Sequence, residues 1–156
     1  MVYVALLRGI GPLNPNMRSE KLREFFESLG FRNVQSVIAT GNILFESNAK
    51  DSKALEEKIE KALPQKLGFK STTIIRSRDD IQKLVDSKPF GKTLDTPKSW
   101  LNVTFLKRGG QDFSIIDTTS TKTPDIMRQL EKKHGKEITT RTWKTIDKIL
   151  KKLNEY

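Results

Sequence analysis

The chain opens with a run of apolar residues that does not alternate with polar ones. Val2 to Leu7 is this run, and such a pattern is typical of a β-strand buried on both faces of its sheet. A loop rich in Gly and Pro follows. The i, i+3, i+4, i+7 spacing of an amphipathic helix is then met by Leu22, Phe25, Phe26 and Leu29. The pattern therefore predicts a strand, then a helix, with a packing partner on each face of the strand.

The next segment predicts a hairpin, a helix and a further strand. The β-rich runs 34–39 and 42–46 are separated by Thr40 and Gly41, which favours a tight turn. A second helical stripe ends at the segment 64–68, and a short strand occupies 72–76. The resulting order over residues 1–78, βαββαβ, is that of a ferredoxin-like unit, or alpha-beta plait, whose helices cover one face of a four-stranded sheet.

The second half of the chain, residues 79–156, again mixes helices and strands. Asp79 and Asp80 open a helix, two strands flank the Gly109-Gly110 turn, and a helix stops at Gly135. An extended segment, 138–142, leads into a last amphipathic helix. We therefore expect an α+β fold of two packed ferredoxin-like units, 1–78 and 79–156, with the second half covering the open sheet face of the first.

Composition excludes several chemistries. The 156 residues include no Cys and one His, which rules out disulfides, thiolate zinc sites, a Cys nucleophile and a multi-His metal site. We expect no cofactor and no metal, and His134 at a helix end is expected to interact with the helix dipole. The apolar run Val2 to Leu7 is far short of the roughly 20 residues that span a bilayer. Because this run already begins the first strand, the sequence predicts no secretion signal, no membrane partner and a cytoplasmic location.

Four separated blocks of the sequence resemble one bacterial family. These blocks are Val2 to Ile10, Leu22 to Phe31, Asn33 to Ser47 and Thr139 to Leu150. Together they resemble the family called domain of unknown function 1697. The chain departs from many relatives after Ile10, where a longer lysine-containing loop is replaced by Gly11 to Asn16. The resemblance implies a pair of alpha-beta plaits and no established activity, so the chemistry has to be inferred from the residues themselves.

The first candidate for ligand binding is Arg8 with Gly9, directly after the first strand. A guanidinium there can bind a carboxylate or phosphate through two N–H groups, and Gly9 lets the backbone approach closely. The alternative is that Arg8 pairs with a carboxylate of the protein and Gly9 only forms a turn. Asn42, after Gly41, is open to two similar interpretations: its amide contacts a ligand, or it completes the turn.

The second candidate is a cluster at the start of the last helix. Its ligand-binding members are Thr139, Thr140, Arg141, Trp143 and Lys144. If Thr142 caps this helix, Arg141 lies beside the positive end of the helix dipole, which is unfavourable for a cation unless an anion joins it. The alternative is a capped helix with Trp143 in the core and Arg141 directed toward water or an acidic neighbour.

Net charge and these two candidates favour one function over another. The chain has 29 Lys and Arg against 19 Asp and Glu, a net charge of +10, which favours acidic partners. We expect a noncatalytic basic binding module for a phosphorylated or other anionic ligand, nucleic acid included. The alternative is a small-molecule enzyme with a metal-free anion site between the two halves, for which the sequence offers no clear general base. A homodimer is compatible with either. Both hypotheses depend on Arg8 and Arg141 reaching one open pocket.

Overall fold

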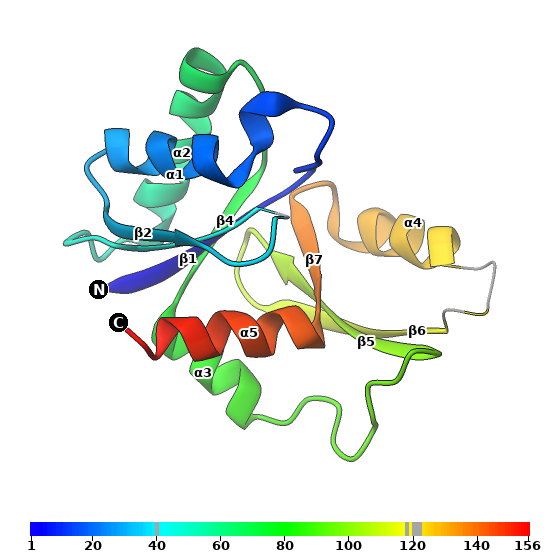
Figure 1. The fold of residues 1–156 in the computed structure, drawn as a ribbon. Coiled ribbons are helices and arrows are strands. Elements are labelled where there is room, and N and C mark those ends of the chain that lie inside the picture. Colours follow the sequence, from blue (N-terminus) through cyan, green and yellow to red (C-terminus); the bar gives the residue numbers. More distant parts are fainter. Residues whose placement is uncertain (40, 118, 120–122) are drawn as a thin grey trace.

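A computed structural model describes residues 1–39, 41–117, 119 and 123–156 of the chain (Figure 1). This part of the protein contains two antiparallel β-sheets and five α-helices. The elements in chain order are β1 (Val2–Leu7), the short 3-10 helix η1 (Pro15–Met17), α1 (Ser19–Ser28), β2 (Arg32–Ser36), β3 (Asn42–Glu46), α2 (Ser52–Leu67), β4 (Thr73–Ser77), α3 (Arg78–Asp86), β5 (Ser99–Leu106), β6 (Gln111–Asp117), α4 (Thr123–His134), β7 (Ile138–Thr142) and α5 (Trp143–Leu153).

The first sheet is covered on both faces, as the apolar run in β1 predicts. Its strand order is β2-β3-β1-β4, and each neighbouring pair is antiparallel. Tyr3, Ala5 and Leu7 belong to a core cluster with residues of α1 and α2, whereas Val4 and Leu6 belong to a second cluster with residues of α3 and α5. Figure 1 shows α1 and α2 on one side of this sheet and α3 and α5 on the other. The second half of the chain therefore covers the first sheet, with two helices.

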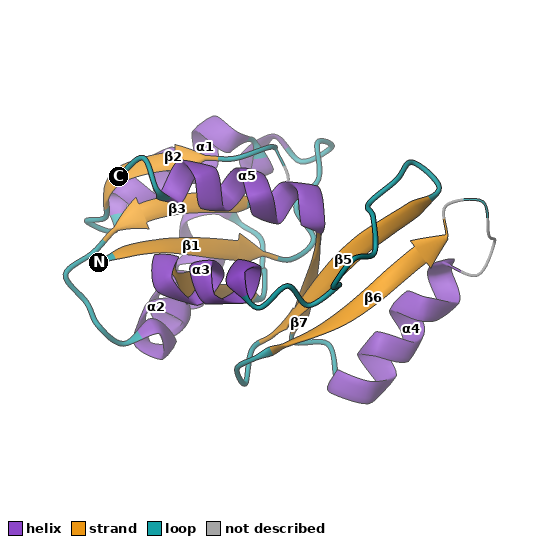
Figure 2. Ribbon diagram, turned by 90° about the horizontal axis from the view of Figure 1, so that it is seen from below, coloured by secondary structure: helices purple, strands orange, loops and turns teal. Residues whose placement is uncertain are grey.

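The second sheet has the order β6-β5-β7 and is also antiparallel (Figure 2). Val103 and Phe105 of β5 enter the same core cluster as α3 and α5. On the opposite face Leu106 and Ile138 pack with Leu130 of α4 in a small separate cluster. The sheet thus lies between α4 and the core that the two halves share.

The expectation of a mixed α and β protein is confirmed, with two antiparallel sheets. The finer expectation of two ferredoxin-like units is not confirmed, because the second sheet has three strands in the described part of the chain, whereas a plait has four. Element boundaries also move. β2 ends at Ser36 rather than at residue 39, because Ile38 has a φ of 56° and leaves the extended conformation. α2 continues through Pro64 to Leu67 and is capped by Gly68, whose φ is 78°.

Candidate functional site

Arg141, at the end of β7, is buried at the junction between the two sheets. Its side chain donates from Nε to Oδ1 of Asn42 at 2.6 Å and from Nη2 to the carbonyl oxygen of Leu7 at 2.8 Å. Nη1 donates to Oγ1 of Thr139 at 2.5 Å and to the carbonyl oxygen of Thr140 at 3.0 Å. Burial lowers the pKa of Arg141 to about 10. The guanidinium therefore ties β7 to the ends of β1 and β3.

The other polar residues predicted around Arg141 take part in the same junction. Asn42 is fully buried, and its Nδ2 donates to the carbonyl oxygen of Val37 at 3.0 Å, which closes the connection between β2 and β3. Thr140 forms a hydroxyl pair with Thr104 of β5 at 2.8 Å. These contacts give Asn42, Thr139 and Thr140 structural roles. That they also bind an anion stays a prediction.

Arg8 lies at the same junction but on its outer side. Its Nη2 forms an ion pair with Glu131 of α4, and its Nη1 donates to the carbonyl oxygens of Lys136 and Ile138. The neighbouring Gly9 is exposed and has a φ of 76°. Arg8 thus has a carboxylate partner within the protein, as the alternative interpretation described. That Arg8 also binds an anion stays a prediction. Arg8 and Arg141 both contact β7 or the residues before it, but Arg141 is enclosed and Arg8 is paired.

Trp143 and Lys144 begin α5. Thr142 caps this helix as expected, since its Oγ1 accepts from the backbone N–H of Thr145 at 3.3 Å. The half-buried Trp143 ring meets Phe90 edge to face, with ring centroids 5.4 Å apart, and lines a cavity of about 450 Å³ with residues of the 85–95 segment. Lys144 is exposed. The predicted cluster is therefore divided: Thr139 to Arg141 lie in the junction between the sheets, whereas Trp143 packs against the 85–95 segment.

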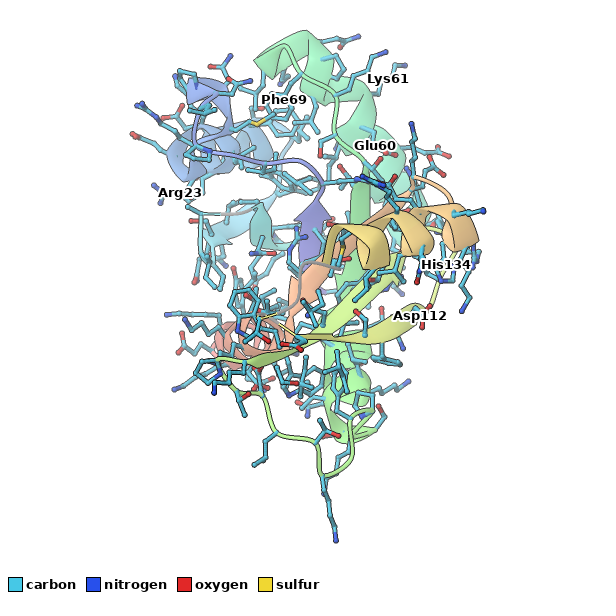
Figure 3. All side chains as sticks on the ribbon, turned by 90° about the vertical axis from the view of Figure 1, so that its right-hand side faces the viewer. Arg23, Glu60, Lys61, Phe69, Asp112 and His134 are labelled. Carbon is cyan, nitrogen blue, oxygen red and sulfur yellow. The ribbon has the colours of Figure 1, made fainter. Side chains whose placement is uncertain are left out.

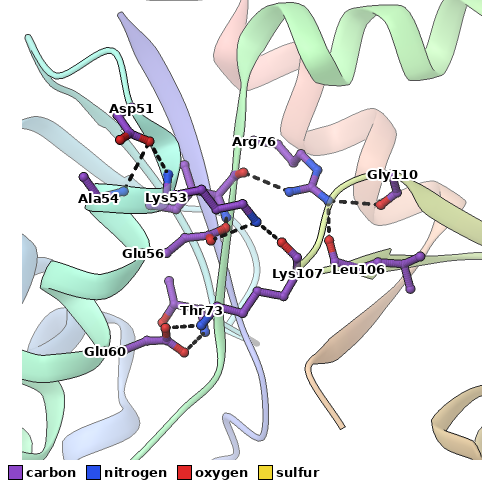
Figure 4. A network of polar contacts seen from close by, with 11 residues as sticks. Asp51, Lys53, Ala54, Glu56, Glu60, Thr73, Arg76, Leu106, Lys107 and Gly110 are labelled. Atoms are coloured by element: carbon purple, nitrogen blue, oxygen red, sulfur yellow. Dashed lines mark hydrogen bonds and ion pairs between the residues drawn. The ribbon is translucent and has the colours of Figure 1, made fainter. Parts of the chain in front are cut away.

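A second cavity, which sequence reasoning missed, brings cations from separate elements together. It has a volume of about 430 Å³, is open to solvent, and is lined by the start of α2, the end of β4, α3 and the turn between β5 and β6 (part of this region is shown in Figure 4). Three cations line it, Lys53, Arg76 and Lys83, against the carboxylate of Asp80. The cations lie far apart in the sequence and form no motif. Of the residues that line this cavity, Gly109 and Gly110 were predicted from the sequence to form a turn, and that turn forms one wall.

Arg76 is held rigidly on the wall of this cavity. Its Nη2 donates to the carbonyl oxygens of Leu106 at 2.8 Å and Gly110 at 3.0 Å, and its Nη1 donates to that of Ile75 at 3.1 Å. The guanidinium also lies over the Phe105 ring, 5.7 Å from its centroid. Burial lowers the pKa of Arg76, and the negative charges of Glu56 and Asp80 oppose this shift. Within the described chain, Nε and one Nη1 hydrogen make no hydrogen bond.

A network of charged side chains joins the walls of the cavity across the two halves (Figure 4). Glu56 of α2 is 1% exposed, and its Oε2 accepts from the backbone N–H of Ile75 at 2.8 Å. Its Oε1 lies 3.5 Å from Nζ of Lys53, which also donates to the carbonyl oxygen of Lys107. The Lys107 ammonium in turn pairs with Glu60. The turn between β5 and β6 is thereby fastened to α2.

His134, the one histidine, is engaged at both ring nitrogens. Its Nε2 lies 2.8 Å from Oδ2 of Asp112, and its Nδ1 lies 2.8 Å from Nη2 of Arg108. Figure 3 shows His134, at the end of α4, close to Asp112 of β6. Because a guanidinium can only donate, Nδ1 accepts and the Nε2–H donates to Asp112. This bond is the main cause that lowers the pKa of Asp112. The ring is therefore part of the contact between α4 and β6 and has no free nitrogen for base catalysis.

The described residues contain neither a cluster of metal-binding side chains nor a membrane-spanning helix. Within residues 1–39, 41–117, 119 and 123–156, no group of three or more His, Cys, Asp or Glu side chains is arranged to hold a metal ion. In the same residues, no helix combines the length and the apolar composition needed to cross a bilayer.

The fold and its cavity define a mixed α/β protein with two antiparallel sheets and a cationic hollow between its halves. The sequence profile of the family described as "Protein of unknown function (DUF1697)" matches residues 1–133, so the chain belongs to this family. The resemblance of its first three sequence blocks is thus confirmed, and the fourth block, 139–150, lies beyond the matched span.

A solved structure shares the fold over the whole chain. The conserved bacterial protein SP0830 from Streptococcus pneumoniae is similar with a TM-score of 0.77, covers 98% of both chains and is 22% identical. A comparison with curated proteins gives no match. The comparisons therefore support the family and the fold, and any function has to be argued from the cavity.

Proposed function

We propose that this protein is a noncatalytic binding module for a small anionic ligand, one that carries phosphate or several carboxylate groups. The observation that carries the proposal is Arg76, which lines the cavity: its guanidinium is fixed by three backbone carbonyls and keeps N–H groups without a hydrogen bond among the described residues. A preorganised guanidinium binds carboxylate or phosphate with little loss of side-chain entropy. Lys83 supplies further positive charge at the same cavity, where the ammonium of Lys53 is already paired with Glu56.

The carboxylates near the cavity already have partners within the protein, so they oppose a bound anion less than free carboxylates would. Asp80 is the carboxylate on the lining, and its Oδ2 already accepts from the backbone N–H of Ser77 at 2.9 Å in the capping box of α3. Glu56 lies behind the wall and is used by Lys53 and by the Ile75 backbone. An anion about 4 Å from one of the cations would gain on the order of 4 kcal/mol of Coulomb energy before desolvation, at an effective dielectric constant near 20.

The size of the cavity and the burial of the sheet favour a small ligand over a nucleic acid strand. A volume of about 430 Å³ falls in the range of small-molecule sites, about 300–1,000 Å³. RNA-binding plaits stack bases on aromatic side chains of an open sheet. Here Tyr3 and Phe45 on the sheet are 2% and 0% exposed, so they cannot stack on bases. The order β2-β3-β1-β4 supports a ferredoxin-like plait for residues 1–78 as a scaffold rather than as a nucleic-acid platform.

Thermal-shift titration with inorganic pyrophosphate tests this proposal. The wild-type protein should gain stability as pyrophosphate rises into the millimolar range, because a ligand that binds only the folded state raises the melting temperature. The exposed Lys83→Gln variant should lose most of this shift, and Arg76→Lys should lose it because an ammonium cannot replace the fixed fork. Lys21→Gln, an equal loss of charge at an exposed lysine of α1 away from the cavity, is the matched control and should behave as the wild type.

The outcomes distinguish anion binding at the Arg76 cavity from anion binding at Arg8, the site predicted from the sequence. If Arg8→Gln abolishes the shift while Lys83→Gln keeps it, the anion binds at the outer junction and the cavity is not the site. If the wild type shows no shift with pyrophosphate, orthophosphate or citrate, the proposed function is wrong. A shift that Lys83→Gln and Lys21→Gln reduce equally would indicate a general effect of net charge and would also refute the cavity as the site.

A further inference from the structure

The outermost strand of the second sheet, β6, differs from the other strands at sheet edges. An exposed edge offers unpaired N–H and C=O groups to another strand, and proteins usually protect it with a bulge, a proline, a lysine or a short strand. β2 is interrupted by a register shift between Arg32 and Gln35, and both β4 and β7 are five residues long. β6 is seven residues long, pairs with β5 in unbroken register and contains neither Pro nor Lys.

Apolar side chains accompany this edge, on which the backbone N–H of Phe113 donates to Oδ1 of its neighbour Asp112 at 2.8 Å. Phe113 is 37% exposed and Ile115 is 48% exposed, although both stand across from buried β5 residues, Val103 and Leu101. As alternate residues of one strand they lie on the same face of the sheet. Phe113 also meets Phe90 edge to face, with ring centroids 5.6 Å apart. Phe113 and Ile115 thus extend the apolar side of this sheet to its outermost strand. Figure 2 shows β6 at the edge of the second sheet, with α4 alongside it.

We infer that β6 pairs with β6 of a second copy of this chain, antiparallel and about a two-fold axis, so that two three-stranded sheets join into one of six strands. The midpoint of Gln111–Asp117 is Ser114, so a pairing centred there uses all seven residues. It places Phe113 across from the second copy's Ile115, and Ile115 across from the second copy's Phe113. The four exposed apolar side chains then cover one another.

The two carboxylates of β6, Asp112 and Asp117, fit this register, and Asp112 is already paired with Lys133 of α4. Asp112 stands across from the second copy's Ile116, and Asp117 stands across from the second copy's Gln111, so no carboxylate faces another. Centring the pair on Phe113 would leave Ile115 against Gln111, and centring it on Ile115 would place Asp117 against Phe113. Each chain carries a net charge of +10, so the two copies repel one another at a distance. Salt screens this repulsion, and the dimer should therefore tighten as ionic strength rises.

A single introduced cysteine tests the register directly, because the chain has no Cys of its own. In Ser114→Cys, each thiol stands across from its twin, and residues paired in this way have Cα atoms about 4.5–5.5 Å apart, within disulfide range. The Ser114 hydroxyl is buried without a hydrogen-bond partner among the described residues, so its loss costs no bond. In the control Gln111→Cys, the twin lies six residues further along the strand, about 20 Å away.

Mild oxidation should give a covalent dimer at least tenfold faster with Ser114→Cys than with Gln111→Cys on nonreducing gels.

Sedimentation velocity should show a dimer for the wild type and at least tenfold weaker association for Ile115→Lys, which adds a charge to the edge. Leu94→Lys makes the same change at a side chain that is 75% exposed outside the strand, and it should not weaken the dimer. A wild type that stays monomeric at all concentrations, a dimer indifferent to Ile115→Lys, or equal cross-linking of the two cysteine variants would overturn the inference. None of these results depends on anion binding.

Discussion

Gly41 lies where the loop after β2 crosses the end of β1, and replacing it by alanine should destabilise the protein strongly. Its φ is 85°, and a Cβ added there would lie 2.7 Å from Cγ1 of Ile10 and 3.0 Å from the carbonyl oxygen of Leu7. That oxygen also accepts from Nη2 of Arg141 at 2.8 Å, so it cannot move away without weakening the junction between the sheets. The substitution therefore perturbs both the backbone and its surroundings.

The size of the effect follows from two separate costs. A residue with a Cβ in the left-handed region costs about 1–2 kcal/mol. Forcing an extra methyl into a packed position costs typically about 1–3 kcal/mol. For Gly41→Ala we therefore expect a loss of about 2–5 kcal/mol in the free energy of unfolding. Gly9→Ala isolates the first cost, because Gly9 has a φ of 76° but a Cβ there would meet nothing within 4 Å.

Urea unfolding followed by circular dichroism measures both variants. Gly41→Ala should lose about 1–3 kcal/mol more than Gly9→Ala, which is the part due to packing. Combining Gly41→Ala with Ile10→Ala should recover part of this difference, because the closest contact is removed, and a double-mutant cycle would show the coupling. Equal losses for Gly41→Ala and Gly9→Ala, or no coupling to Ile10, would refute the reasoning.

Two further predictions concern Arg141 and Asp112. Arg141→Met leaves the buried acceptors of Leu7 and Asn42 without this donor and should lower the free energy of unfolding in urea by about 2–4 kcal/mol. Arg141→Lys should recover only part of this loss, because one ammonium cannot reach both acceptors. A loss below about 1 kcal/mol for Arg141→Met would show that the guanidinium is not needed at the junction. The pKa of Asp112 lies below its ordinary value of 3.8, mainly through the bond from His134. Its contribution to stability is therefore present above that value and is lost as the pH falls through the lower, folded-state pKa. Asp112→Asn should be less stable than the wild type near neutral pH, and the gap in unfolding free energy should close on acidification; a gap that stays constant would contradict this role.

The positions of most elements could be predicted because they depend on local periodicity. The extended segment 138–142, the cap at Thr142 and the helix after it are found as predicted. The two-faced apolar pattern of β1 correctly indicated cover on both sides of the sheet. The end of β2 was wrong by three residues, because the positive φ of Ile38 follows from how its loop crosses β1 and not from its own preference.

The candidate site was harder to predict than the fold. Sequence reasoning selected Arg141 and Asn42 as ligand contacts, and the structure joins them to each other across a separation of 99 residues. It overlooked Arg76, because an arginine near the end of a strand gives no local sign that three carbonyl groups will hold it. A binding motif can be recognised in a sequence when its ligand-binding residues lie in one loop. The cations of this cavity instead come from three separate elements, α2, β4 and α3.

The sequence by itself determined which residues form strands and helices, which faces of them are apolar, the excess of positive charge and the family. Only the tertiary structure decided which cations are enclosed, which are paired and which face a cavity. The physical reason is that periodicity reports the environment of a residue within its own element. The burial and partners of a charged side chain depend instead on the segments that fold against it from elsewhere in the chain.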